Sequence, residues 1–284
     1  MSNLPTSESI TENEENLPPA RRRRRRRMIV PEGEGKRAAF IEELSRAAVP
    51  SFDFFLFSLV SGVMMGVAIL LDSPSLYILY IVIAPFMAPA VGLSLATIVG
   101  SSRYFLQALI GVLIGGALTF FTGVATGWVS HVIDGLSFEQ TFLHAQVSLP
   151  DLTITIIGAG ITTYLLARNP KHTSIIPNAI LVYTLYLPLG VAGFGLTSSV
   201  SGLWPNGIML FLIHLATATL SGSVVLALLG LRPRNLYGYL LAGGLIVVLL
   251  ASALLVQGFT PVLELAQFPT MTPTPTLSPT ITLT

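Results

Sequence analysis

Few residues of this chain could bind a solute or an ion, and they lie within long apolar runs. His214 is the one ionisable side chain deep inside such a run. Its imidazole could take up a proton, bind a substrate oxyanion or ligate an ion, because an ionisable group at membrane depth usually has a function. The alternative is a neutral ring that hydrogen bonds to a carbonyl of a broken helix.

Two prolines interrupt another apolar run. Pro85 and Pro89 stand four residues apart in I-A-P-F-M-A-P-A-V-G-L, and each removes a backbone donor and clashes with the preceding turn. A helix must therefore break or kink here, and a second break is predicted at Pro188 in P-L-G-V-A-G-F-G-L. In hydrocarbon a broken helix needs protein or a water-lined cavity around its freed carbonyls, which is typical of a functional centre.

We therefore predict a binding site for a small solute or ion at the two breaks, formed by backbone groups and helix-end partial charges. Thr217 belongs to a polar group that either lines a path or bonds to its own helix backbone. The candidate substrate-binding residues are Pro85, Met87, Pro89, Gly92, Pro188, Gly195, His214 and Thr217.

Other polar residues carry weaker signals. Asp53 and Asp151 each open a span, where a carboxylate caps free N–H groups, although their repetition leaves a functional role open. The chain has no cysteine, and it lacks H-E-x-x-H, G-x-S-x-G and Walker-type motifs. We therefore expect no enzymatic activity, no cofactor and no metal site.

Membrane-spanning helices must position these residues. Hydrophobic residues make up 52% of the chain and charged residues 10%, and the mean hydropathy is +0.75. Such a chain is too apolar for a soluble domain, and its apolar runs repeatedly exceed the length that crosses a bilayer. The sequence predicts an all-α polytopic membrane protein with about seven transmembrane helices. These spans are expected at 52–71, 76–99, 104–127, 152–167, 175–194, 206–229 and 236–259.

The basic residues predict the orientation. With the N-terminus in the cytoplasm, all fifteen Lys and Arg residues fall on cytoplasmic segments. We therefore expect a multi-pass protein of the cell membrane with a cytoplasmic N-terminus and an extracytoplasmic C-terminus. The seven arginines at 21–27 act as a topology signal or bind anionic lipid through Arg21, Arg24 and Arg27, and nucleic acid is not expected as a partner.

Composition divides the chain into six parts. The last helix has no counterpart in the rest of the chain and is expected to serve packing or a homo-oligomer contact. The parts are a disordered cytoplasmic tail with the arginines (1–35), an amphipathic interfacial helix (36–50), a first three-helix repeat (51–149), a second, inverted three-helix repeat (150–230), an extra transmembrane helix (236–259) and a disordered Thr/Pro-rich extracytoplasmic tail (260–284).

The two repeats are related by offsets of 98, 103 and 99 residues. Each half contains three spans, so the second half must cross the membrane in the opposite sense to the first. The sequence thus predicts a 3+3 inverted-topology repeat, with proline-broken second and fifth helices that meet near the midplane. The aligned pairs are Asp53 with Asp151, Pro85 with Pro188, and Leu113 with Leu212.

The run Leu70–Leu95, L-L-D-S-P-S-L-Y-I-L-Y-I-V-I-A-P-F-M-A-P-A-V-G-L-S-L, resembles the signature of a prokaryotic membrane family called domain of unknown function 389. That family shows a Ser-rich turn and an apolar helix that ends in a P-L-M-x-P-I-like break. Its L-V-P-P-L-like motif is matched in part at Tyr186–Leu189, and its L-F-x-x-N-like motif at Leu210–His214, with histidine for asparagine. The resemblance covers about 53–229 and implies the fold and a membrane location.

These features lead to two functional hypotheses. The first is a secondary transporter or channel-like permease for a small solute or ion, with its site at the broken second and fifth helices. The alternative is a non-transporting membrane anchor or sensor scaffold that acts through its polybasic N-terminal tail.

Overall fold

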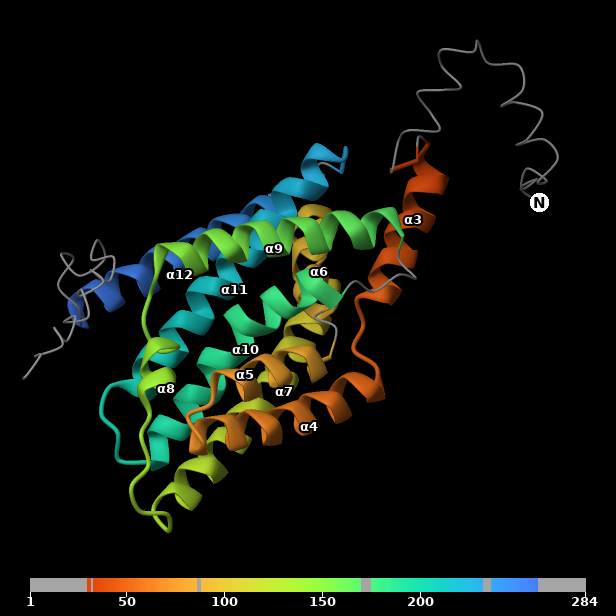
Figure 1. Cartoon of the computed structure of the whole chain (residues 1–284). Coiled ribbons are helices and arrows are strands. Elements are labelled where there is room, and N and C mark those ends of the chain that lie inside the picture. Colours follow the sequence, from red (N-terminus) through yellow and green to blue (C-terminus); the bar gives the residue numbers. More distant parts are fainter. Residues whose placement is uncertain (1–29, 32, 86–87, 170–174, 232–235, 260–284) are drawn as a thin grey trace, which may run out of the picture.

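The structure is a bundle of helices (Figure 1). The computed structural model describes residues 30–31, 33–85, 88–169, 175–231 and 236–259, without the side chains of 175–176 and 255–259. Every regular element within these ranges is a helix, so the predicted all-α fold class is confirmed. The helices are α3 (Glu34–Ala47), α4 (Phe52–Leu70), α5 (Pro74–Ile83), α6 (Ala88–Val99), α7 (Ser102–Ser130), α8 (Glu139–Leu143), α9 (Leu149–Arg168), α10 (Ile175–Thr197), α11 (Leu203–Leu228) and α12 (Leu236–Phe259).

The protein is a polytopic membrane protein. Six helical stretches are long and apolar enough to cross a membrane, and the bent pair α5 and α6 makes a seventh if it counts as one span. Apolar side chains on the outer helices stay exposed, such as Phe57 on α4, Ile157 on α9 and Val247 on α12. In water such surfaces would be costly, whereas in a bilayer they face lipid.

α6 and α10 form the centre of the bundle. Every residue of α6 from Ala88 to Ile98 is buried, as is 78% of the apolar window of α10, against 11% for α12. α10 packs against α7 and α11, while α4 covers α7 and α9 covers α11 (Figure 1). The two central helices carry four of the eight predicted site residues, Pro89, Gly92, Pro188 and Gly195.

Small residues allow α7 and α10 to approach each other closely. A side chain at Gly123 of α7 would collide with the backbone of Gly190, and one at Gly193 of α10 would collide with the backbone of Phe120. Close contact of this kind is how helices associate where lipid removes the hydrophobic driving force between them. α10, which carries Pro188 and Gly195, is therefore held against α7 by close backbone packing.

α3 overlaps the segment 36–50, for which the sequence predicts an amphipathic interfacial helix. Leu44 and Ala48 are buried, Phe40 and Ile41 are partly buried, and the charged residues Glu42 and Glu43 are exposed. Leu44 joins an apolar cluster with residues from α6, α9 and α11. The apolar side of α3 is thus packed on the bundle.

The connection between α7 and α9 folds back onto the bundle over Ser137–Ser148, which we call the docked loop. The Asp72 carboxylate accepts hydrogen bonds from the hydroxyl of Ser137 (3.2 Å) and the backbone N–H groups of Glu139 and Gln140 (both 3.0 Å). Asp72 thereby satisfies free N–H groups at the start of α8 from another part of the chain. The loop is consequently a fixed part of the fold.

Candidate functional site

The second predicted span is broken, as the sequence predicted. α5 ends at Ile83, α6 begins at Ala88, and the pair is bent by 59°. Ala84 has a ψ of 147°, an extended backbone that ends α5 and that a residue before proline prefers. Pro85 and Pro89 are buried, and Met87 lies outside the described residues. The described residues on both sides of the break are therefore enclosed by protein, as hydrocarbon requires.

A side chain from α10 supplies a hydrogen bond to the break. Asn178 Nδ2 donates to the carbonyl oxygen of Pro85 at 3.1 Å, and both residues are buried. This carbonyl needs an outside donor because α5 has already ended. Sequence reasoning missed Asn178, although an amide inside an apolar span is a signal, since polar side chains in membranes pair across helices.

α10 is continuous through Pro188, so the predicted break in the fifth helix is wrong. The helix runs over Ile175–Thr197 with Pro188 inside it. One internal proline removes only the backbone hydrogen bond to the carbonyl four residues earlier, which is that of Thr184. His214 Nδ1 lies 2.7 Å from this oxygen. The imidazole replaces the missing donor, which is why the helix can continue.

His214 is a buried histidine with one free ring nitrogen. Its exposed fraction is 2%, and Nε2 has no hydrogen-bond partner among the described residues. A carbonyl oxygen can only accept, so Nδ1 must carry the hydrogen, and in the neutral ring Nε2 then holds a lone pair. The bundle therefore contains a buried base whose acceptor position is unused by the described side chains.

The family comparison fits this region of the molecule. The model of the family described as "Domain of unknown function (DUF389)" matches residues 81–220. This range includes the break, Asn178, α10 and His214. Residues 81–220 belong to the DUF389 family. No curated protein and no solved structure matches the chain. The predicted resemblance is thus confirmed, and the family description specifies no activity.

The DUF389 region does not bring all predicted site residues to one place. Pro188 lies ten residues beyond Asn178 in sequence, about 15 Å along α10, so it is remote from the break at Pro85. It is close to His214 instead, through the Thr184 carbonyl. Thr217 is half-buried on α11, three residues after His214.

The two predicted glycines and Pro89 lie at helix contacts. A side chain at Gly92 would meet Ala48 and Ala108 at 3.0 Å, and one at Gly195 would meet Leu203 at 2.5 Å. Pro89 packs near Gly111 of α7. These small residues let α6 and α10 approach neighbouring helices, a packing role that the structure makes visible.

The two repeated aspartates lie in the first turns of α4 and α9, but serines cap these helices. Ser51 accepts from the backbone N–H of Phe54 at 3.3 Å, and Ser148 accepts from that of Asp151 at 3.1 Å. The capping role expected for the aspartates is therefore wrong, because a serine at the N-cap position already satisfies the free donor. Asp151 instead accepts a long hydrogen bond of 3.4 Å from the hydroxyl of Tyr183 on α10.

His144 of the docked loop lies between two tyrosines. Its ring centre is 4.9 Å from that of Tyr77 and 5.5 Å from that of Tyr183. Burial lowers the pKa of His144 below its ordinary value, and the nearby Asp151 carboxylate opposes part of that effect. The loop thus brings a titratable ring next to the Asp151–Tyr183 pair.

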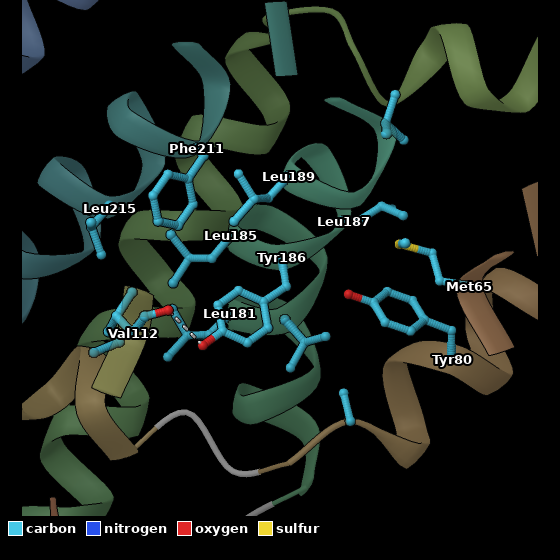
Figure 2. Close-up of a cluster of buried hydrophobic side chains, with 14 of the residues drawn as sticks. Met65, Tyr80, Val112, Leu181, Leu185, Tyr186, Leu187, Leu189, Phe211 and Leu215 are labelled. Carbon is cyan, nitrogen blue, oxygen red and sulfur yellow. Dashed lines mark hydrogen bonds between the residues drawn. The ribbon is translucent and has the colours of Figure 1, made fainter. Parts of the chain in front are cut away.

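Two buried tyrosines, Tyr186 of α10 and Tyr80 of α5, lie where α10 faces α5 and α7. Figure 2 shows Tyr186, whose hydroxyl donates to the carbonyl of Val112 at 3.1 Å, and Tyr80 directed toward α10. The Tyr80 hydroxyl is fully buried and has no partner within the described part of the chain. α10 therefore carries polar contacts on more than one side, toward the break, α7 and α11.

Proposed function

We propose that this protein is a permease, a secondary transporter or channel-like protein for a small solute or ion, with no enzymatic activity and with its site at the break between α5 and α6. The observation that carries the proposal is the interruption between α5 and α6, where the buried Pro85 carbonyl accepts a hydrogen bond from Asn178. Broken helices at the centre of a membrane bundle offer partial charges and free backbone groups to a substrate.

Hydrogen bonds at equivalent positions support the proposed inverted repeat. The hydroxyl of Ser223 on α11 donates to the carbonyl of Ser94 on α6 at 3.2 Å. The hydroxyl of Thr197 on α10 donates to the carbonyl of Val124 on α7 at 2.8 Å. The offset of 103 residues relates Ser94 to Thr197, and that of 99 relates Val124 to Ser223. Each pair joins the two halves, as a pseudo-twofold axis between them requires.

Contacts within the halves support the same relation. A side chain at Gly62 of α4 would touch Thr122 of α7, and one at Gly160 of α9 would touch Ser221 of α11 at 3.7 Å. The offset from Gly62 to Gly160 is 98 residues, and that from Thr122 to Ser221 is 99. The first and third helices of each half therefore meet at matching positions. The continuous α10 makes the proposed repeat asymmetric, with one broken helix and one intact helix.

The proposed orientation places the N-terminus in the cytoplasm and the C-terminus outside the cell membrane. Arg37 on α3 donates to the carbonyl of Gly230, just after α11, so these two segments lie on one side of the bundle. Arg46, Arg103 and Arg168 are exposed near helix ends. Basic residues near helix ends favour the cytoplasmic side. The arginines at 21–27, proposed to bind anionic lipid, lie outside the described residues, as do most of the two terminal tails.

A thermal-shift screen of the purified protein tests the proposal. A ligand that binds only the folded state raises apparent stability by RT ln(1 + L/Kd), where L is the free ligand concentration. We expect a concentration-dependent shift with one class of ions or small metabolites, and we expect the Pro85→Ala variant to lose it. Pro74→Ala is the matched control, because Pro74 lies at the start of α5, where proline is tolerated. A shift with anionic lipid alone, lost when 21–27 are deleted, would favour the scaffold hypothesis.

A further inference from the structure

Three helices converge beside His214. The hydroxyl of Tyr183 on α10 donates to Asp151 on α9, and the next residue of α10, Thr184, carries the carbonyl that accepts from His214 on α11. Asp151, Tyr183 and His214 are therefore linked through one turn of α10. We call them the His–Asp cluster.

The register of α9 against α11 places Asp151 at the depth of His214. Ser221 donates to the carbonyl of Ile156 at 2.8 Å, and a side chain at Gly160 would touch Val225. The two residues of each pair are 65 positions apart, and a constant offset means that α9 and α11 run parallel. The same offset places Asp151 of α9 level with position 216 of α11. Two residues of helix correspond to a rise of about 3 Å. The carboxylate and the imidazole thus share one level of the bundle.

The surroundings of His214 favour a positive ligand. Its Nε2 lone pair is buried without a described partner, and the nearby carboxylate of Asp151 is negative, so an anion would be repelled. Among the helices packed on α11, α6 carries no titratable side chain. α10 carries Tyr186 besides Tyr183, and the Tyr186 hydroxyl donates to the Val112 carbonyl of α7. The remaining titratable groups are Tyr164 and Arg168 on α9 and Tyr237 and Tyr239 on α12, near the opposite ends of their helices.

We propose that Nε2 of His214 is a proton-binding site with Asp151 as its counter-charge, so that transport is coupled to protons. Uptake uses the Nε2 lone pair to form an N–H bond and converts the ring to an imidazolium, while loss of the proton restores the lone pair, and nothing is oxidised or reduced. A proton needs no cavity, which suits a ring that is 2% exposed. His144 of the docked loop contacts Tyr183, so the His–Asp cluster extends to this loop. The inference rests on the proposed function for its physiological meaning.

NMR of the protein labelled with ¹⁵N-histidine, in lipid nanodiscs without added solute, tests this proposal. The chain has four histidines. The His214→Asn variant identifies the His214 signal, because an asparagine Nδ2 takes the place of Nδ1 and preserves the hydrogen bond to Thr184. We expect the wild-type signal to report a hydrogen on Nδ1 at high pH and reversible protonation of Nε2 as the pH falls.

Removing the counter-charge should weaken proton binding by about tenfold or more. We expect this for Asp151→Asn, whereas Asp134→Asn, in the exposed turn after α7, should leave the titration unchanged. A ring that stays neutral down to about pH 4, near the ordinary pKa of a carboxyl, would overturn the proposal, as would equal titrations in both variants. Because the titration needs no transported solute, absence of flux with a titrating His214 would contradict the proposed function alone. Solute flux with a neutral His214 would contradict only the proton site.

Discussion

At the scale of single residues, backbone carbonyls without a helical donor are paired with side chains from other helices. The Pro85 carbonyl accepts from Asn178, and the Thr184 carbonyl, left free by Pro188, accepts from His214. A buried carbonyl without a partner costs free energy, so these two side chains stabilise the proline-containing segments. The same pairing leaves Nε2 of His214 available for chemistry.

Replacement of His214 by alanine should lower the free energy of unfolding by about 1–3 kcal/mol, because the Thr184 carbonyl loses its donor. His214→Asn should retain most of the stability. The measurement is unfolding in detergent, followed by the fluorescence of the two tryptophans.

The same His214→Ala substitution is also measured in the Pro188→Ala variant, in which the new backbone N–H can bond to the Thr184 carbonyl. In that background His214→Ala should cost clearly less, since the carbonyl no longer depends on the imidazole. Equal costs in the two backgrounds would show that the histidine and the proline are not coupled.

At the scale of elements, hydrophobic runs and prolines predicted the spans well. The predicted span 236–259 coincides with α12, and the proline pair placed the break between α5 and α6. The same rule failed at Pro188, because whether a single proline breaks a helix depends on a donor from a distant residue, His214. The docked loop was missed for a similar reason, since its anchor Asp72 lies 65 to 68 residues earlier in the chain.

Docking of the loop should weaken in mild acid. Burial lowers the pKa of His144 below the ordinary value of 6.5, so the undocked loop binds protons more readily than the docked one. Docking is therefore strongest above about pH 6.5 and is lost progressively as the pH falls toward the lowered pKa. Hydrogen exchange of the Ser137–Ser148 amides, corrected for intrinsic rates, should show less protection at about pH 5.5 than at about pH 7.5.

The His144→Phe variant is the control for that experiment. Phenylalanine keeps an aromatic ring between Tyr77 and Tyr183 but cannot take up a proton. Its loop protection should be independent of pH over the same range. A wild-type loop with equal protection at both pH values would contradict the role given to His144.

At the scale of the whole molecule, the matching contacts at offsets of 98, 99 and 103 residues suggest a common plan for the two halves. Sequence similarity alone supplied the offsets, but it could not supply the contacts, which depend on how α6, α7, α10 and α11 cross. The difference between the halves is the break, which only the first half retains. We propose that this asymmetric element is where transport occurs.

Cysteine labelling tests the proposed orientation, since the natural chain has no cysteine. Ser102→Cys, at the start of α7, should react with a membrane-impermeant thiol reagent only after the cytoplasmic side is opened. Asp134→Cys, after the other end of α7, should react from outside intact cells. Both positions are exposed, so accessibility depends on the side alone. Labelling with the sides exchanged would contradict the orientation.

The most direct test of the central claim is solute uptake into proteoliposomes, using the compound with the largest thermal shift. We predict uptake by the wild-type protein and at least a tenfold loss in Pro85→Ala/Pro89→Ala, in which α5 and α6 can join as one helix. Pro74→Ala, at the start of α5, should transport normally. Unchanged uptake in the double variant would contradict the claim that the break is the transport site.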